Sequence, residues 1–414
     1  MALMGTPLVV VLACAAILIP IATLALWSRV HGPRVLRGFV RLFMLVTAQL
    51  AAVALVAVLA NNYGQFYTSW SDLLGTDNTP PTTALYGAPH HNGHTDPRIA
   101  RTTPGIATGK LQLLGNTTWS TPHQWATRGK VISTRLTGLR SGLSDPAYVY
   151  LPPQYFWPQF AHRRFPAVEI MSGYPGSALE LVSRMDYPSR GLVLSHEHRT
   201  VPMIYVMLSS TVAPPRDTEC TNIPGGPQAE TFLSGELTSA VEHALRVQPG
   251  HWGVIGDSTG GYCAAKLAMF HPATYAGAVS LSGYYHALNG GTAGDLFNGS
   301  KARQHKNDLR WLLKHRAAPS ANLYVTIGKR ETSKAEGYSE TMKFLHLVKP
   351  PMHVTAVIEA NGGHNFRTWA RELPAATAWL SRRMTAPTTA LKPNHHRLSI
   401  PGGEPLASHG PDTV

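Results

Sequence analysis

Two long apolar runs precede every other pattern in the chain. Pro7 to Trp27 contains no charged side chain, and Leu42 to Ala60 is interrupted only by Thr47 and Gln49. A helix needs about 20 apolar residues to cross the hydrocarbon core of a membrane. The pattern therefore predicts a transmembrane hairpin over residues 1–62.

The alternative for the first run is a signal peptide. Such a peptide begins with basic residues, whereas residues 1–6 contain no Lys or Arg. The short segment between the two runs carries four positive charges and no acid, at Arg29, Arg34, Arg37 and Arg41. Because basic short loops stay in the cytoplasm, we expect both chain ends, and everything beyond residue 61, to lie outside the cytoplasm.

Residues 63–114 show no clear periodicity, and we interpret them as a juxtamembrane segment and linker. They begin with aromatic residues suited to a membrane interface, Tyr63, Phe66, Tyr67 and Trp70. Residues 71 to about 112 are rich in Pro, Thr, Gly and His. The linker contains His90, His91, His94 and Asp96, but no rigid element to hold them, so solvated side chains are expected rather than a metal site. The Pro-rich residues 385–414 are predicted to be a disordered tail.

Between residues 115 and 384, short apolar runs alternate with amphipathic stretches. The predicted strands are Ala147–Leu151, Ala167–Met171, Met203–Leu208, Trp252–Ile255, Ala278–Leu281, Leu323–Ile327 and His353–Ile358. Most are continuously apolar, as strands covered on both faces are. Helical spacing is found in Glu230–Val247, Thr341–Val348 and Ala370–Met384. This alternation predicts an α/β domain with a mainly parallel sheet and helices on both faces.

Composition and charge add little to this picture. The 414 residues are 44% hydrophobic and 14% charged, and the formal net charge is +13. Nucleic acid is a poor partner outside the cytoplasm. A basic surface there fits anionic lipid headgroups, acidic wall polymers or simple solubility.

A nucleophile motif follows the predicted strand Trp252–Ile255. Residues 256–260 read Gly-Asp-Ser-Thr-Gly and lead into an Ala-rich helix. This is the G-x-S-x-G elbow in its required strand–turn–helix context, with Ser258 as the nucleophile. The order Gly-Asp-Ser also resembles the serine of trypsin-like proteases. Thr259 interrupts that match, and the α/β pattern with partners downstream of the serine excludes it.

The base and the acid should follow the serine in the chain. His364 lies in a Gly-Gly-His-Asn loop directly after the strand His353–Ile358, so it is the predicted base. Glu331 follows the strand Leu323–Ile327 and is the first choice for the acid. Glu336 is the alternative, although a role at a helix start also explains it.

Two backbone amides should stabilise the oxyanion. One is expected from Thr259, the residue after the nucleophile. The other is expected from the loop after Ala167–Met171. In that loop Pro175 has no N–H, so Tyr174 is preferred, with Gly173 or Gly176 as alternatives. A simple tight turn is the competing interpretation of the loop.

The chain has three cysteines, and one of them, Cys14, lies in the first apolar run. Cys220 and Cys263 are then the only pair exposed to an oxidising exterior. We expect the strand Met203–Leu208, upstream of Cys220, to lie beside the strand leading to Ser258. Cys263 is in the helix after Ser258, so the two cysteines should be close enough for a disulfide. Two buried free thiols are the alternative.

With these motifs in place, residues from about 130 to 384 resemble the putative esterase family. This family joins esterase D-type (S-formylglutathione hydrolase-like) enzymes and the actinobacterial mycolyltransferases. The resemblance is carried by the Ser258 elbow and by Tyr148–Pro153, Gly173–Gly176 and Gly362–Asn365. The hairpin ending in Phe66–Leu73 looks like the membrane-anchored actinobacterial branch.

The resemblance implies an α/β-hydrolase fold and a catalytic triad, which carries over to Ser258, Glu331 and His364. The chain departs from the family in having Glu rather than the commoner Asp, and Asp257-Ser258-Thr259 around the nucleophile, so substrate preference is not carried over.

Three functions are compatible with these features. The first is an extracytoplasmic serine esterase acting on an ester or acyl-lipid substrate through an acyl-enzyme. The second is an acyltransferase that passes the acyl group to a sugar hydroxyl. The third is a non-catalytic membrane scaffold, against which the complete set of Ser, acid and His argues. No cofactor or metal is predicted.

Overall fold

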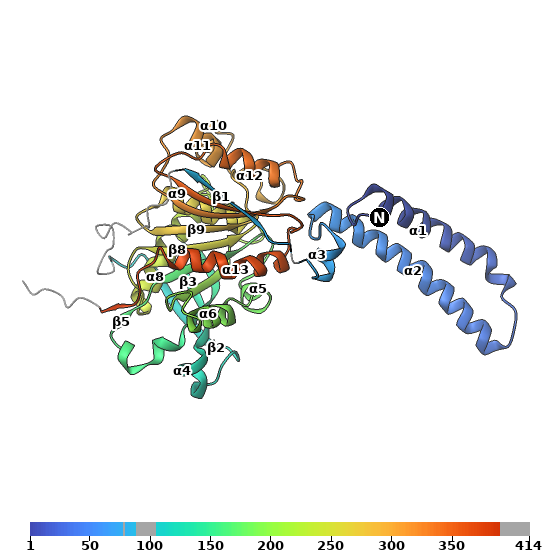
Figure 1. Cartoon of the computed structure of the whole chain (residues 1–414), viewed down its shortest axis with the longest axis horizontal. Helices are drawn as coiled ribbons and strands as arrows, with labels where there is room; N and C mark the ends of the chain where they lie inside the picture. The colour runs from blue at the N-terminus through green and yellow to red at the C-terminus, as the bar shows by residue number, and fades with distance from the viewer. Residues whose placement is uncertain (78, 88–104, 390–414) are drawn as a thin grey trace, which may run out of the picture.

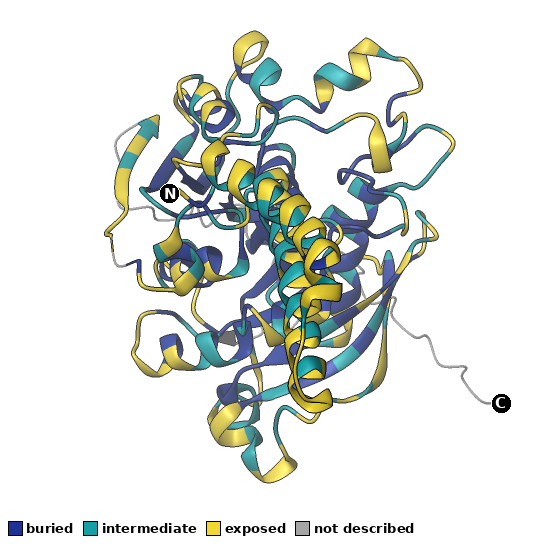
Figure 2. Cartoon of the chain, turned by 90° about the vertical axis from the view of Figure 1, so that its right-hand side faces the viewer, coloured by how far each residue is buried: buried dark blue, intermediate teal, exposed yellow. Residues whose placement is uncertain are grey.

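The structure is a computed structural model that describes residues 1–77, 79–87 and 105–389. The residues His90, His91, His94 and Asp96, which we expect to be solvated, lie outside the described residues, as do residues 390–414 of the predicted tail. Two long helices, α1 (Thr6–Leu26) and α2 (Arg34–Gly64), extend side by side from an α/β body (Figure 1). Both are long and apolar enough to cross a membrane. Most of their apolar side chains are exposed (Figure 2).

The body is built on one ten-stranded sheet with the order β1-β11-β10-β9-β8-β6-β7-β4-β3-β2. The strands from β11 to β7 in this order are parallel to one another, and β1, β4, β3 and β2 pair antiparallel. The bounds are β1 Thr82–Gly87, β2 Gly109–Asn116, β3 Lys130–Gly138, β4 Ser144–Leu151, β6 Ala167–Ser172, β7 Ile204–Ser209, β8 Trp252–Asp257, β9 Tyr275–Leu281, β10 Asn322–Gly328 and β11 His353–Glu359.

Helices cover both faces of the sheet and form two apolar cores with it. One face carries α5 (Ala178–Ser183), α6 (Tyr187–His196) and α13 (Phe366–Ser381); the other carries α8 (Thr238–Ala244), α9 (Thr259–Phe270), α11 (Leu309–His315) and α12 (Tyr338–Leu345). Shorter elements are α3 (Trp70–Leu74), α4 (Trp125–Arg128), α7 (Ala229–Thr231), α10 (Lys301–Lys306), and the paired strands β5 (Arg163–Arg164) and β12 (Thr388–Thr389). The α/β-hydrolase prediction, with a mainly parallel sheet, is confirmed.

All seven predicted strands are present, but the structure differs from the sequence analysis in two places. Residues 71–112 are not a featureless linker, because they contain α3, the edge strand β1 and the start of β2. β1 is largely exposed, so it lacks the apolar run by which buried strands are recognised. In addition, β7 does not lie beside β8 as expected, because β6 lies between them.

Candidate active site

Ser258 occupies a strained turn between β8 and α9. Its φ is +53° and its ψ −121°, a conformation that a residue with a side chain rarely adopts. The turn is tightly packed: a Cβ at Gly256 would lie 2.0 Å from the Gly260 carbonyl oxygen, and a Cβ at Gly260 would lie 2.3 Å from the Met171 carbonyl oxygen on β6. The two glycines of the motif therefore let the serine project from the carboxyl end of the sheet.

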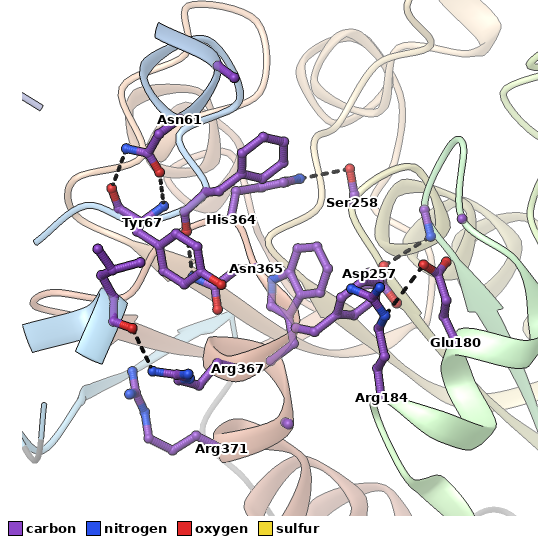
Figure 3. Close-up of a pocket in the computed structure, with 18 of the residues that line it drawn as sticks. Asn61, Tyr67, Glu180, Arg184, Asp257, Ser258, His364, Asn365, Arg367 and Arg371 are labelled. Carbon is purple, nitrogen blue, oxygen red and sulfur yellow. Dashed lines mark hydrogen bonds and ion pairs between the residues drawn. The ribbon is translucent and has the colours of Figure 1, made fainter. Parts of the chain in front are cut away.

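Ser258, His364 and Glu331 lie in one line of hydrogen bonds. The Ser258 Oγ is 2.9 Å from His364 Nε2, and His364 Nδ1 is 2.9 Å from Glu331 Oε2 (Figure 3 shows the first contact). Glu331 is only 2% exposed. Its Oε1 accepts hydrogen bonds from the Gly328 N–H at 2.8 Å and from the Ser282 hydroxyl at 2.9 Å. This geometry fixes the carboxylate, which in turn orients the imidazole.

The surroundings of His364 make it a stronger base. Burial alone lowers its pKa, but the hydrogen bond and the charge of Glu331, with the charges of Glu336 and Asp257, outweigh burial and raise the pKa. The protonated imidazole is therefore stabilised by three carboxyl groups. This is the form that His364 takes after accepting a proton from a serine.

Glu336, the alternative acid, precedes α12 and makes no hydrogen bond to His364 within the described part of the chain. Burial raises the pKa of its own carboxyl, the His364 charge opposes that shift, and the Glu331 charge adds to it. Glu336 acts on His364 only through its charge. The geometry favours Glu331 as the orienting acid.

The loop after β6 leaves one backbone amide free near the serine. The Gly173 N–H donates to Asp257 Oδ2 at 3.0 Å, and the Gly176 N–H donates to the Gly173 carbonyl at 2.7 Å. The Tyr174 N–H has no acceptor in the described residues. The Thr259 N–H is at the first position of α9, where a helix provides no acceptor. Of the three residues considered in this loop, Tyr174 is the one whose N–H is available to an oxyanion.

Asp257, whose role was not predicted from the sequence, organises this loop through its bond to Gly173. Burial raises its pKa to about 7, and the Gly173 hydrogen bond opposes that rise. Its Oδ1 is buried without a hydrogen-bond partner among the described residues.

Two cavities meet at Ser258 and His364. The larger, of about 1280 Å³, is lined mainly by apolar side chains and by part of α2. The smaller, of about 630 Å³, lies beside Thr259 and Tyr284 and contains the carboxyl groups of Asp217, Glu219 and Glu336. Within the described part of the chain, no group of three or more His, Cys, Asp or Glu side chains is arranged to hold a metal ion.

The segment after α2 braces the histidine loop, a contact that no sequence pattern indicated. The His364 N–H donates to the Gln65 carbonyl at 3.0 Å, and the Thr68 hydroxyl donates to the Asn361 carbonyl at 2.7 Å. Gln65 Oε1 accepts from the backbone N–H groups of Thr332 at 2.6 Å and Ser333 at 3.1 Å. The same segment therefore contacts the loops that carry both His364 and Glu331.

Cys220 and Cys263 are joined by a disulfide with a Cα–Cα distance of 5.7 Å. The bridge ties the loop after β7 to α9, although β6 separates the strands that lead to the two cysteines. The residue before Cys220 is Glu219, whose Oε1 accepts a 2.7 Å hydrogen bond from the Tyr284 hydroxyl. The disulfide thus also fixes one wall of the smaller cavity.

Comparison with known proteins agrees with this arrangement. Residues 144–380 match the family described as Putative esterase. Over 245 residues the chain is 23% identical to an uncharacterized protein of Corynebacterium glutamicum, covering 57% of each chain. A shorter stretch of 75 residues is 37% identical to the MPT51/MPB51 antigen of Mycobacterium tuberculosis, covering 18% of this chain and 25% of that one. The matched stretches thus span little more than half of the length of the first relative and a quarter of the length of the second.

Solved structures share the fold at low sequence identity. An S-formylglutathione hydrolase from Agrobacterium tumefaciens superposes with a TM-score of 0.55 at 14% identity, over 66% of this chain and all of that one (100%). A ferulic acid esterase superposes with a TM-score of 0.50 at 13% identity, over 62% of this chain and 99% of that one. Because the family match covers more than half of the sequence, the chain belongs to the putative esterase family, and it has the α/β-hydrolase fold.

Proposed function

We propose that the protein is a membrane-anchored, extracytoplasmic serine esterase that hydrolyses carboxylic esters through an acyl-enzyme. The observation that carries the proposal is the unbroken line of 2.9 Å contacts from Ser258 through His364 to Glu331. A serine hydroxyl needs such a base to become a nucleophile. The line ends at a strained turn that opens into two cavities, which leave room for the two parts of an ester.

In the acylation step, His364 Nε2 takes the proton of Ser258 as Oγ attacks the ester carbonyl carbon. The N–H groups of Thr259 and Tyr174 stabilise the oxyanion. When the bond between the acyl carbon and the alcohol oxygen breaks, His364 returns the proton to the leaving alcohol. Water then attacks the acyl-enzyme by the same route, which releases the acid and restores Ser258. Glu331 holds the proton on Nδ1 and stabilises the imidazolium.

Support for the membrane anchor comes from α1 and α2, whose exposed apolar surfaces would otherwise face water. Arg29 lies between α1 and α2, and Arg34, Arg37 and Arg41 lie at the start of α2. These positive charges favour a cytoplasmic position for that end of the hairpin and hence an external body. A disulfide is typical of oxidising compartments and supports the same placement. Protease added to intact cells should then remove a tag attached at Val414. Protection of the tag until the membrane is broken would overturn the placement.

An acyltransferase is the second candidate, favoured by the smaller cavity. The lining of that cavity is more polar than the lining of the larger one, and the cavity could hold an alcohol acceptor close to Ser258 and His364. Carboxyl groups such as Glu219 and Asp217 can accept hydrogen bonds from sugar hydroxyls. Both candidate reactions share the acyl-enzyme and differ only in the second nucleophile. A purely structural role gains no support from a site that retains all three catalytic side chains.

The proposal is tested with a fluorophosphonate probe, which reacts with activated serines. Wild-type protein should be labelled, and Ser258→Ala should not be. Absence of labelling in the wild type would favour the non-catalytic scaffold. Product analysis of ester turnover with and without trehalose separates the two enzymes: free acid in both cases indicates hydrolysis, and an acylated sugar indicates transfer.

A further inference from the structure

The larger cavity beside Ser258 is bounded on one side by the helix pair. From α2 it receives Ala54, Ala57, Val58, Ala60 and Asn61. All of these except Ala60 follow the spacing i, i+3, i+4, i+7 and form one stripe along the helix. Ala54, Ala57 and Val58 of this stripe lie inside the apolar run Leu42–Ala60. The cavity therefore connects the nucleophile with a helix surface made of membrane-spanning sequence.

The side chains of the stripe are small and apolar, except for Asn61 at the end near the body. The polar groups of Asn61 already have hydrogen-bond partners. The Asn61 side chain donates to the Tyr67 carbonyl at 2.9 Å and accepts from the Tyr67 N–H at 2.8 Å (Figure 3). Both functions of the amide are thus used within the protein. Ala54, Ala57 and Val58 leave space that the protein does not fill, which suits a hydrocarbon chain rather than a polar group.

One polar side chain that lines the cavity has capacity for a ligand. Asp257 lines the same cavity, is 2% exposed, and has its Oδ1 without a hydrogen-bond partner among the described residues. Such a buried oxygen is costly unless a ligand or water satisfies it. The cavity that Asp257 lines has a volume of about 1280 Å³, which is large enough for a sizeable amphiphile.

The cavity also has an excess of positive charge. Arg184 and Arg190 line it from the α5–α6 side. The contact of Arg184 with Glu180 is long, at 3.9 Å, and 64% of the Arg184 side chain is exposed. Arg190 uses its Nε to donate to the Met185 carbonyl at 2.8 Å, which leaves its terminal nitrogens available. An anionic group could accept charge-assisted hydrogen bonds from both guanidinium groups.

We propose that the substrate is an ester lipid resident in the membrane, whose acyl chain lies along Ala54, Ala57 and Val58 and whose anionic headgroup contacts Arg184 and Arg190. The inference rests on the proposed function, because Ser258 must be the nucleophile. The lipid reaches the site from the bilayer along α2 and does not pass through water. α2 is then both an anchor and a wall of the substrate site.

The test compares long and short probes on full-length protein in detergent micelles. The measured quantity is the ratio of the rate constants for inactivation by a hexadecyl fluorophosphonate and by an ethyl fluorophosphonate. Ala57→Leu and, as a second variant, Ala54→Leu should lower this ratio about tenfold or more, because the added methyl groups fill the stripe. Ala52→Leu is the matched control: it lies on α2 but outside the cavity, is exposed, and should keep the wild-type ratio.

Two outcomes separate the inference from the proposed function. If the ethyl probe labels Ser258 in the wild type but the ratio is the same in Ala57→Leu, Ala54→Leu and Ala52→Leu, the acyl route along α2 is wrong and the esterase proposal stands. If the ethyl probe does not react with Ser258 in the wild type, the proposed function itself fails.

The headgroup is tested by competition with two single-chain lipids that share one acyl chain. Monoacyl phosphatidylglycerol is anionic and monoacyl phosphatidylcholine is zwitterionic. The anionic lipid should protect Ser258 from the hexadecyl probe at a concentration at least fivefold lower than the concentration of the zwitterionic lipid that gives the same protection. The double variant Arg184→Gln/Arg190→Gln should remove this difference. Equal protection by both lipids in the wild type would overturn the headgroup assignment.

Discussion

The active site has two walls that differ in origin. One wall comes from the body, where Ser258, Glu331 and His364 follow strands β8, β10 and β11 of one sheet. The other comes from residues 54–73, and a contact such as Thr68 to Asn361 joins positions 293 residues apart. In the proposed function, the body supplies the reacting groups, whereas the N-terminal segment holds the histidine loop in place and lines the larger cavity. The three proposed catalytic residues lie within the residues that match the family, whereas part of the larger cavity's wall lies outside that match.

The largest effect on activity is expected from a substitution of the nucleophile, which belongs to the body. Ser258→Ala should reduce turnover of p-nitrophenyl esters by about 10⁶, the scale of a lost triad nucleophile. The fold should persist, because only a hydroxyl is removed, and an unchanged melting temperature checks this. Retention of most of the activity would show that Ser258 is not the nucleophile.

Glu331→Gln should lower kcat by about 10⁴, because the imidazole loses the partner that fixes its tautomer. Glu336→Gln is the matched control, since Glu336 is close enough to affect the His364 pKa but makes no hydrogen bond to the ring. It should retain kcat within about tenfold at the pH optimum. If Glu336→Gln lost most of its kcat while Glu331→Gln kept a nearly normal kcat, Glu336 would be the acid instead of Glu331.

The disulfide couples the nucleophile helix to the smaller cavity. It closes a loop with a sequence separation of 43, so on the chain-entropy account its loss should lower the free energy of unfolding by about 4 kcal/mol. Cys263→Ala should therefore melt several degrees lower than the wild type, whereas Cys14→Ala, which changes the unpaired cysteine, should not. Alkylation of both Cys220 and Cys263 without prior reduction would rule the bridge out.

A substitution in the N-terminal segment should have a smaller effect on catalysis than the loss of a triad residue. Thr68→Val keeps the shape of the side chain but removes the hydroxyl that donates to the Asn361 carbonyl. A neutral hydrogen bond is worth about 1 kcal/mol, so kcat/KM should fall about fivefold. Thr76→Val, an exposed change on the same segment, serves as the control. Equal activity of Thr68→Val and the wild type would mean that the body holds the histidine loop without help.

The pH dependence should show the smallest effect. The base must be neutral to accept the Ser258 proton, so activity falls as the pH drops through the pKa of His364. Because the neighbouring carboxylates raise that pKa above its ordinary value of 6.5, the acidic limb of the kcat/KM profile should lie above pH 6.5. Glu336→Gln removes one negative charge and should move the limb to lower pH. A limb that moves upward in this variant would contradict the electrostatic account.

The sequence predicted the body well where the structural signal is local. The buried strands β8 and β10 are continuous apolar runs, and the glycines around Ser258 mark a turn that few other sequences could form. β1 could not be recognised in this way, because it is an exposed edge strand whose partner, β11, lies far along the chain. The contacts of Gln65 and Thr68 with the loops of Glu331 and His364 were also missed. Their partners in those loops are backbone carbonyl and N–H groups, which carry no residue-specific signal.

The acyl-enzyme itself provides the most direct test of the central claim. Full-length protein is mixed with p-nitrophenyl butyrate, quenched in acid within the first turnovers, digested and analysed by tandem mass spectrometry. The account predicts a butyryl group on Ser258 in the wild type, and none in the corresponding peptide of Ser258→Ala. Turnover of the ester with the butyryl group on another side chain would contradict the account. The account would also be contradicted if a Glu331→Gln variant, slowed enough for the acyl-enzyme to accumulate, turned over the ester but gave no acylated peptide.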